Sequence, residues 1–311
     1  MVNVSVILPN YNHEKFLERR IHTILNQTYQ DFELIVLDDC SKDDSVQILK
    51  KYSNHPKVTH IVLNEKNSGS TFIQWKKGID LAQGKFIWIA ESDDEASPHF
   101  LEKLVPVLDR DNSLGLVYSQ SLVIDENSEI LYNKIEWTND LSEIHWKEDF
   151  KNSGKDECLN YLCFKNTIPN ASAVIFRKKA IINSPLPVEM KMTGDWYFWV
   201  SILGNTNLAF IAEPLNFFRE TQTSTRVHNT IKKRIRRLEE GLLVSLLIVK
   251  LYNPKNDAFI AEVKRNLLSY FELCGYKVFL TKPLFWNMFF SKYNYVLLDT
   301  LYQYSSQRKL K

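Results

Sequence analysis

The chain has 311 residues, of which 44% are hydrophobic and 24% are charged, and its formal net charge is +2. This composition excludes a disordered chain, and the length allows one large domain with a smaller second one. The longest apolar stretch, at 242–251, is shorter than the about 20 residues that span a bilayer, so no transmembrane helix is expected.

The first hundred residues are expected to alternate between strands and helices. The strands are short, apolar and β-branched, as in a sheet that is buried on both faces. Strands are expected at 4–8, 32–37, 58–63 and 86–90, and helices at 16–25, 46–49 and 72–81. This alternation predicts an α/β fold with a mostly parallel sheet and helices on both faces.

The rest of the chain is less regular. A helix is expected at 98–108, strands at 114–124, 171–176, 208–212 and 215–219, and a short helix at 194–203. Residues 125–165 are polar and are expected to be irregular. From residue 230 onward the pattern is helical, with breaks at Asn253-Pro254 and Lys282-Pro283. The sequence therefore predicts an α/β region over 1–225 and a helical region over 226–311.

Polar turns follow three of the first four expected strands. They lie at 9–12, at Asp38 and Asp39, and at 91–94. Right-handed crossovers place the carboxyl ends of parallel strands at one edge of the sheet, where such sheets bind ligands. We therefore expect these three turns to converge in space.

The turn at 91–94 carries three carboxylates, on Glu91, Asp93 and Asp94. Carboxylates this close repel one another unless a cation neutralises them, and oxygen ligands favour Mg²⁺ or Mn²⁺. Such an ion completes its shell with substrate phosphates and stabilises a departing diphosphate. The alternative is an acidic helix N-terminus before Ser97-Pro98. The position at a strand end favours the metal.

The other two turns offer groups for a nucleotide. A carboxylate of Asp38 or Asp39 can accept a hydrogen bond from a base or a ribose, and Ser41 and Asp43 are available to cap the next helix. Tyr11 offers an aromatic face for a base, with a partly buried core tyrosine as the alternative.

Taken in order, these motifs resemble family 2 glycosyltransferases with the GT-A fold. The resemblance rests on PNYN at 9–12, LDDCSKD at 37–43 and AESDD at 90–94, and it is densest over residues 1–125. It implies a Rossmann-like, mostly parallel sheet and a nucleotide-sugar donor, expected to be a UDP-sugar. It also implies that 1–125 form the nucleotide-sugar-binding half and 126–225 the acceptor-side half of a catalytic domain.

The resemblance also implies roles for individual residues in this DXD-type site. Pro9 and Tyr11 would line the base pocket, and Asp39 would bond the base. Asn12 and Asp38 would belong to the same donor site. Asp93 would contact the ribose or share the metal, and Asp94 would be the main protein ligand of Mn²⁺ or Mg²⁺.

Asp195 is the expected catalytic base. Inverting transfer needs a base that removes the proton of an acceptor hydroxyl as its oxygen attacks the anomeric carbon. Family members carry an Asp about 100 residues after the metal motif, before aromatic residues, and TGDWYFW at 193–199 matches that pattern. The aromatic residues are expected to desolvate Asp195, or to stack on an acceptor sugar. The alternative is an N-terminal Asp of a helix with a core aromatic stripe.

Two positions depart from the family pattern. Glu91 stands where the metal motif begins, so its part in binding is open. Arg219-Glu220-Thr221 occupies the place of a common Arg-x-His turn. Arg219 and Arg226 are candidates for pairing with diphosphate oxygens. His228 is a candidate for the metal or a phosphate, with a solvated surface histidine as the alternative.

The C-terminal region is strongly basic. Residues 226–311 contain 16 Lys and Arg but 6 Asp and Glu, a net charge of +10, whereas the rest of the chain has a net charge of −8. The basic run at 231–238 and the aromatic run at 283–290 suit the surface of an anionic membrane. The alternative is a helical subdomain that packs on the catalytic domain. No motif indicates a nucleic-acid partner.

These observations predict a cytoplasmic inverting glycosyltransferase of surface polysaccharide synthesis, peripheral on the cytoplasmic face of the inner membrane. Its acceptor would be a hydroxyl of a glycan or a lipid-linked saccharide. The four cysteines lack metal or disulfide spacing and are expected to be reduced. Two alternatives stay open: a catalytically silent nucleotide-sugar-binding protein, and a sugar-phosphate nucleotidyltransferase. The latter lacks the expected Gly-rich loop after the first strand.

Overall fold

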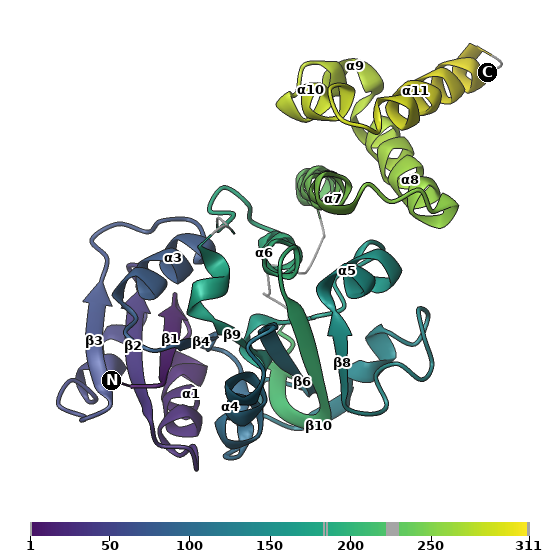
Figure 1. Ribbon diagram of the computed structural model, residues 1–311. Helices are drawn as coiled ribbons and strands as arrows, with labels where there is room; N and C mark the ends of the chain where they lie inside the picture. The colour runs from purple at the N-terminus through teal and green to yellow at the C-terminus, as the bar shows by residue number, and fades with distance from the viewer. Residues whose placement is uncertain (1, 183, 185, 222–229, 310–311) are drawn as a thin grey trace.

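The computed structural model describes residues 2–182, 184, 186–221 and 230–309 (Figure 1). Its centre is one ten-stranded sheet with the order β3-β2-β1-β4-β9-β6-β10-β5, and β7 and β8 pair with β6 and β10. The strands β1 to β4 run parallel, as does the β6–β10 pair, whereas β9 is antiparallel to both β4 and β6. The predicted mostly parallel α/β sheet is therefore confirmed.

The first half follows the predicted alternation closely. Its strands are β1 (Val4–Asn10), β2 (Phe32–Asp38), β3 (Val58–Leu63) and β4 (Phe86–Ile89), and its helices are α1 (Glu14–Leu25), α2 (Ser45–Lys50) and α3 (Thr71–Leu81). The strand β1 continues through Pro9, beyond the predicted end. The backbone carbonyl of Ile7 accepts from the Ala90 amide at 2.8 Å, which is the last hydrogen bond between β1 and the β4 side. Pro9 lies beyond this hydrogen bond. A missing N–H therefore costs no ladder hydrogen bond there.

In the second half, two of the expected strands form one continuous strand. The bounds are β5 (Glu95–Ala96), α4 (Phe100–Arg110), β6 (Leu114–Ile124), β9 (Val174–Arg177) and β10 (Asn207–Arg219). The two strands expected at 208–212 and 215–219 are one strand, β10, whose register with β6 shifts on both sides of Pro214. Such bulges absorb a residue that cannot donate to the ladder.

The region 125–165, expected to be irregular, contains short elements. They are β7 (Ile130–Asn133), the 3₁₀-helix η1 (Lys134–Trp137), β8 (Phe150–Ser153), α5 (Gly154–Glu157) and η2 (Cys158–Leu162). Another 3₁₀-helix, η3 (Ala171–Ala173), precedes β9. Because β8 is four residues long and forms by pairing with β10, its sequence shows too little alternation to predict it.

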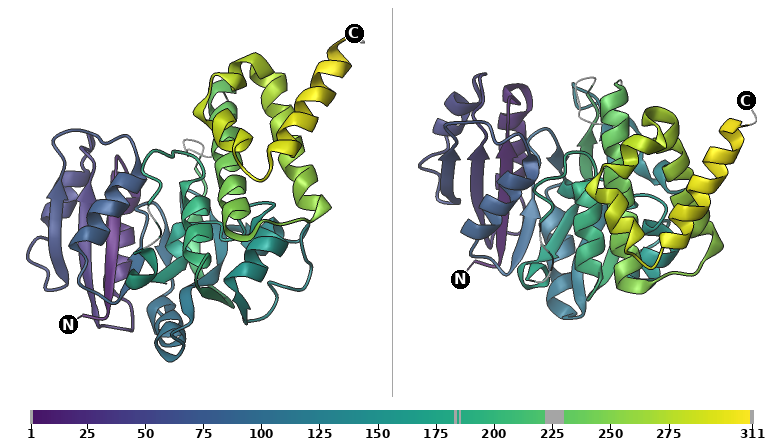
Figure 2. Two further views of the ribbon diagram at one scale, coloured as in Figure 1. Left: turned by 45° about the horizontal axis from the view of Figure 1, so that its top comes forward. Right: turned by 90° about the horizontal axis from the view of Figure 1, so that it is seen from above.

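The helical C-terminal region packs on the α/β region. It comprises α7 (Ile231–Tyr252), α8 (Asp257–Cys274), α9 (Tyr276–Leu280), α10 (Pro283–Phe289) and α11 (Asn294–Lys309). The helix α7 contacts α6 (Gly194–Leu203), and one apolar core joins Phe198 and Trp199 of α6 to Leu242 and Val244 of α7. Figures 1 and 2 show these helices on the side of β6, β8 and β10, away from β1 to β3. The helical region therefore packs on the α/β region through α7.

Two further findings bear on the sequence-based expectations. All four cysteines lie within the described residues, and none forms a disulfide. Among the described helices, none combines the length and the apolar content that crossing a membrane requires.

Candidate active site

The turns after β1 and β2 are bonded to each other. Asn10 Nδ2 donates to Asp38 Oδ2 at 2.8 Å, and Ser41 donates to Asp38 from both its amide and its hydroxyl, at 2.9 and 2.6 Å. Asn12 has a left-handed φ of 54°, and its side chain accepts from the Lys42 amide at 2.7 Å. Asp38 and Asn12 therefore shape the sheet edge, and Ser41 bonds Asp38 instead of capping α2, whose N-cap is Asp44.

Asp39 is bonded to the opposite wall of the same edge. Its Oδ1 accepts from Asn64 Nδ2, the Ser68 amide and Gln74 Nε2 at 2.7, 2.9 and 2.9 Å, and its Oδ2 accepts from Ser68 Oγ at 2.8 Å. Tyr11, by contrast, is 45% exposed and leaves its ring open to a ligand, whereas Pro9 is buried in β1. The edge thus combines a fixed carboxylate with an accessible aromatic ring.

The acidic turn after β4 reaches this edge. His13 Nδ1 lies 2.8 Å from Ser92 Oγ, which joins the turn after β1 to the acidic turn. Asp94 is 2% exposed, and its Oδ1 accepts from the Arg219 amide at 2.9 Å. Burial, followed by the charge of Asp93, raises the pKa of Asp94 to about 7. The three predicted turns therefore converge.

Glu91 lies on the α3 side of this turn. Trp75 Nε1 donates to Glu91 Oε1 at 2.8 Å, and burial together with the charge of Asp93 raises the pKa of Glu91 to about 8. The structure thus gives Glu91 a hydrogen-bond partner in the protein core.

Two buried arginines stand among these acids. Arg219 donates from Nε to the Asp93 carbonyl at 2.8 Å and pairs with Glu95 Oε1 at 2.5 Å. Its guanidinium is buried in these bonds, so the sequence-based suggestion that it pairs with a diphosphate is wrong for this arrangement. Arg226 and His228, the other two candidates, lie outside the described residues.

Arg20 is the second buried arginine, and the sequence patterns did not indicate its place at the site. It occupies a buried face of α1 and lies 5.0 Å from the centre of the Trp88 ring. Burial lowers the pKa of Arg20 to about 10, against the charges of Asp94, Asp93, Glu91 and Glu95. A buried cation thus offsets part of the negative charge at the site, although an arginine in an amphipathic helix carries no signal for that role.

The donor set fits a cation that is held mainly by its substrate. Within the described residues, no group of three or more His, Cys, Asp or Glu side chains is arranged to hold a metal ion. Asp94 and Asp93 supply carboxylates at the turn, where burial, followed by the charge of Asp93, raises the pKa of Asp94. Mg²⁺ and Mn²⁺ often meet a protein through one or two carboxylates and complete their shell with phosphate and water. The residues present therefore fit such an ion.

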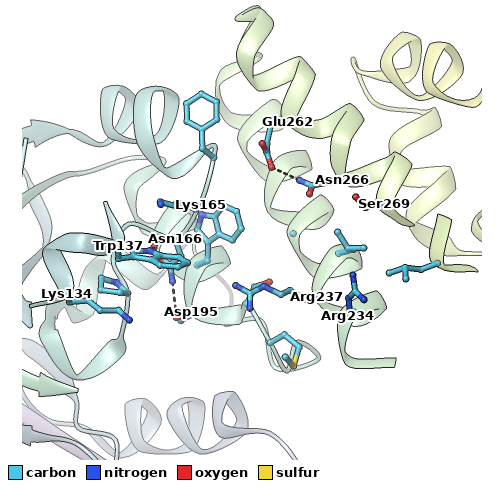
Figure 3. A pocket seen from close by; sticks show the side chains of 18 of the residues that line it. Lys134, Trp137, Lys165, Asn166, Asp195, Arg234, Arg237, Glu262, Asn266 and Ser269 are labelled. Carbon is cyan, nitrogen blue, oxygen red and sulfur yellow. Dashed lines mark hydrogen bonds between the residues drawn. The ribbon is translucent and has the colours of Figure 1, made fainter. Parts of the chain in front are cut away.

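Asp195 lies in a cleft of about 690 Å³ between the α/β region and the C-terminal helices. Asn166 Nδ2 donates to Asp195 Oδ2 at 3.0 Å. Figure 3 shows Asp195 and Asn166 on one wall, and Arg234 and Arg237 of α7 on the facing wall. The cleft is large enough for a sugar-sized ligand.

The aromatic residues after Asp195 divide between core and cleft. Phe198 and Trp199 are buried and pack on Trp75. Trp196 lines the cleft together with Trp137, and its Nε1 donates to the Leu162 carbonyl at 2.9 Å. The core-stripe alternative is therefore confirmed for Phe198 and Trp199, while Trp196 is placed to contact a ligand.

The cleft and the acidic turn share two short segments. Glu220 lines the cleft and directly follows Arg219, whose amide bonds Asp94. Pro169 also lines the cleft, three residues before Ser172, whose hydroxyl accepts from the Glu91 amide at 3.1 Å. Residues 219–220 and 169–172 thus each reach from the acidic turn to the lining of the Asp195 cleft.

The fold is an α/β sheet of the GT-A type, with polar and acidic turns gathered at one edge and a cleft that contains Asp195. The sequence profile of "Glycosyl transferase family 2" matches residues 5–182, and the chain belongs to this family.

Two similar proteins illustrate the relationship. An uncharacterized glycosyltransferase of Methanocaldococcus jannaschii is 26% identical over 294 residues, which cover 92% of this chain and 85% of that protein. The poly(ribitol-phosphate) beta-N-acetylglucosaminyltransferase TarS of Staphylococcus aureus is 32% identical over 117 residues, 36% of this chain and 20% of TarS.

Solved structures show the same fold. The structure of TarS in complex with UDP-GlcNAc matches with a TM-score of 0.65 at 18% identity, over 87% of this chain and 73% of that one. A mannosyltransferase from Pyrobaculum calidifontis, in complex with GDP-Man and Mn²⁺, matches with a TM-score of 0.55 at 16% identity, over 97% and 87% of the two chains. These matches confirm the GT-A fold. The match to the glycosyl transferase family 2 profile favours a glycosyltransferase over the nucleotidyltransferase alternative.

Proposed function

We propose that this chain is an inverting glycosyltransferase that moves a sugar from a UDP-sugar to a hydroxyl of a glycan or lipid-linked saccharide. The observation that carries the proposal is the convergence of Asp39, Tyr11 and Asp94 at one sheet edge, with Asp195 in the adjoining cleft. Residues 1–125 form the donor half, 126–225 the acceptor-side half, and 226–311 the helical region that covers the cleft.

The donor half holds the nucleotide diphosphate. Tyr11 stacks on the base from its exposed position, and Asp93 faces the ribose. Asp39 Oδ2, which also accepts from Ser68 Oγ, offers its remaining lone pair to the base. Pro9, Asn12 and Asp38 support this pocket from below. The bonds of Asp38 and Asn12 fix the turn before a ligand arrives, which lowers the entropic cost of binding.

A bound Mn²⁺ or Mg²⁺ would be held by Asp94 with help from Asp93, and it would stabilise negative charge on the departing diphosphate. Arg219 fixes Asp94 and the backbone of Asp93 from the β10 side. Arg20 supplies a permanent positive charge beneath the turn. These residues thus set the position of the carboxylates.

The acceptor half carries out the proton transfer. The acceptor oxygen attacks the anomeric carbon as the bond to the diphosphate oxygen breaks, and its proton passes to the Asp195 carboxylate. Asn166 orients that carboxylate, and Trp137 and Trp196 offer faces for a sugar ring. TarS, by its name, acts on poly(ribitol-phosphate), and this likeness supports a surface polymer as the acceptor here.

A panel of nucleotide sugars tests the donor assignment. We expect one UDP-sugar to raise the melting temperature of the protein and to release UDP in the presence of Mn²⁺. After chelation, each effect should need an at least tenfold higher concentration of the sugar, because the ion links the diphosphate to Asp94. Thermal shift and nucleotide release measure the two effects. Preference for a GDP-sugar would contradict the UDP assignment. Tight binding with no turnover, even with saccharide acceptors, would instead support the nucleotide-sugar-binding alternative.

We further propose that the enzyme works in the cytoplasm, on the cytoplasmic face of the inner membrane. Exposed apolar side chains gather on α10, α11 and the loop between them, including Trp286 at 51% and Phe290 at 79% exposure. Residues 273–298 contain three lysines and no Asp or Glu. Interfacial aromatics beside lysines suit an anionic lipid surface.

Vesicle flotation tests this surface. The variant Trp286→Ser/Phe290→Ser should bind vesicles of phosphatidylcholine with phosphatidylglycerol about tenfold or more weakly, because burial of each aromatic ring contributes about 1.5–3 kcal/mol. Ile144→Ser, which also removes an exposed apolar side chain but lies in the 125–165 region, should bind like the wild type. Equal vesicle binding by both variants would contradict the membrane assignment.

A further inference from the structure

A buried carboxylate of the C-terminal region bonds the chain just before Asp195. Glu240 lies on α7 and is 1% exposed. Its Oε2 accepts from the Met192 and Thr193 amides, both at 2.8 Å, and its Oε1 accepts from the Lys191 amide at 2.8 Å. Three consecutive backbone donors of the α/β region thus converge on one side chain from the helical region.

These donors lie directly before α6, which begins at Gly194. Thr193 is the N-cap of that helix, and its side chain makes no capping hydrogen bond. The first N–H groups of a helix and its entry need acceptors, and an anion there is favoured by the helix dipole. Glu240 supplies that acceptor from a distant helix, and Asp195 follows two residues after Thr193.

The same segment is fixed from its other side. A Cβ added at Gly194 would lie 2.5 Å from the Phe72 ring, so α3 and α6 approach here as closely as a glycine allows. Arg236, one turn before Glu240 on α7, donates from Nε to Glu240 Oε1 at 2.6 Å and from its terminal nitrogen to the Glu189 carbonyl. The chain at 189–194 is therefore held between α3 and α7.

We propose that Glu240 is a positioning residue for Asp195: its carboxylate sets the start of α6 and thereby the place of the catalytic base in the cleft. The inference rests on the proposed function, because it takes Asp195 as the base. It gives the C-terminal region a part in catalysis, since α7 provides both this carboxylate and the facing wall of the cleft. Misplacement of a catalytic group by about 1 Å can cost about 100-fold in rate.

The test compares Glu240→Gln and Glu240→Ala with the wild type. Gln keeps the volume and one acceptor oxygen, but it turns an amide group toward backbone donors; Ala removes both acceptors. With the nucleotide sugar that gives the greatest UDP release in the donor panel, we expect turnover to fall about 10-fold in Gln and about 100-fold in Ala, with an unchanged KM for the donor. Hydrogen exchange at the 191–193 amides should speed up in the same order.

Glu239→Gln is the matched control. Glu239 is the next residue on α7, and it bonds Tyr270 and Lys282 within the helical region, so its loss loosens that region without touching residues 191–193. We expect its turnover to stay within about twofold of the wild type. Wild-type turnover in Glu240→Ala, or an equal fall in Glu239→Gln, overturns the inference.

Asp195→Asn, measured in parallel, separates the positioning role of Glu240 from the assignment of Asp195 as the base. If it abolishes transfer while the Glu240 variants turn over normally, the positioning role alone is refuted. If Asp195→Asn itself transfers normally, the base assignment fails and the positioning role fails with it. If Glu240→Ala yields no folded protein, Glu240→Gln decides the test. Lowered turnover, an unchanged donor KM and faster exchange of the 191–193 amides in this variant support the positioning role, and wild-type values overturn the inference.

Discussion

Asp195→Asn should reduce sugar transfer by about 10²–10⁴-fold, the range that a positioned general base contributes. Asparagine has the shape of aspartate and still offers an oxygen to Asn166 Nδ2, but it cannot take the proton of the acceptor hydroxyl. Donor binding should stay within about twofold, because Asp195 lies in the cleft and not at the nucleotide edge. Initial rates of transfer, with donor binding measured by thermal shift, check both parts.

The control is Asp257→Asn. Asp257 also lies in the first turn of a helix, α8, but it is exposed and does not line the cleft, so it reports the loss of a first-turn acid alone. Its transfer rate should match the wild type. Full activity of Asp195→Asn would remove Asp195 from the reaction.

Asp94→Asn should lower turnover at least 100-fold and abolish its dependence on Mn²⁺. Asparagine still accepts the hydrogen bond from the Arg219 amide, so the turn keeps its shape while the negative charge that attracts the cation is lost. A Mn²⁺ titration of UDP release measures the effect. A Mn²⁺ response like that of the wild type would show that the ion binds elsewhere.

Glu91→Gln provides the comparison within the same turn. Its side-chain oxygen can still accept from Trp75 Nε1, and the burial that raises the pKa of Glu91 favours its neutral form, which glutamine resembles. Turnover should therefore fall less than tenfold. A loss as large as that of Asp94→Asn would make Glu91 a ligand of the ion.

The elements of the first half were predictable because their patterns are local. The apolar runs at β1, β2 and β4 and the helical spacing of α1 and α3 depend only on nearby residues. The convergence of the polar turns was also predictable, because parallel strands with right-handed crossovers allow only one arrangement of strand ends. Breaks at the two prolines gave the boundaries between α7 and α8 and between α9 and α10, whereas the end of α8 before Gly275, with a φ of +78°, and the break between α10 and α11 were not predicted.

Contacts between distant segments could not be predicted in the same way. Asp38 and Asp39 look alike in the sequence, but Asp38 bonds the turn after β1 and Asp39 bonds α3. The two side chains differ because successive residues at the end of a strand point in opposite directions. Arg219 looked available for a phosphate, and its partner Glu95 is 124 residues away.

The sequence by itself thus determined the fold class, the order of strands and helices in the first half, the family and the acidic turn, because these depend on local patterns and on the topology that parallel strands impose. The tertiary structure alone decided which polar side chains support the site and which face a ligand. It also decided that the basic C-terminal region is partly structural, since Glu240 and the apolar face of α7 find their partners only when α7 packs on α6. Burial and hydrogen bonding depend on what the folded chain brings together, and no local pattern encodes that.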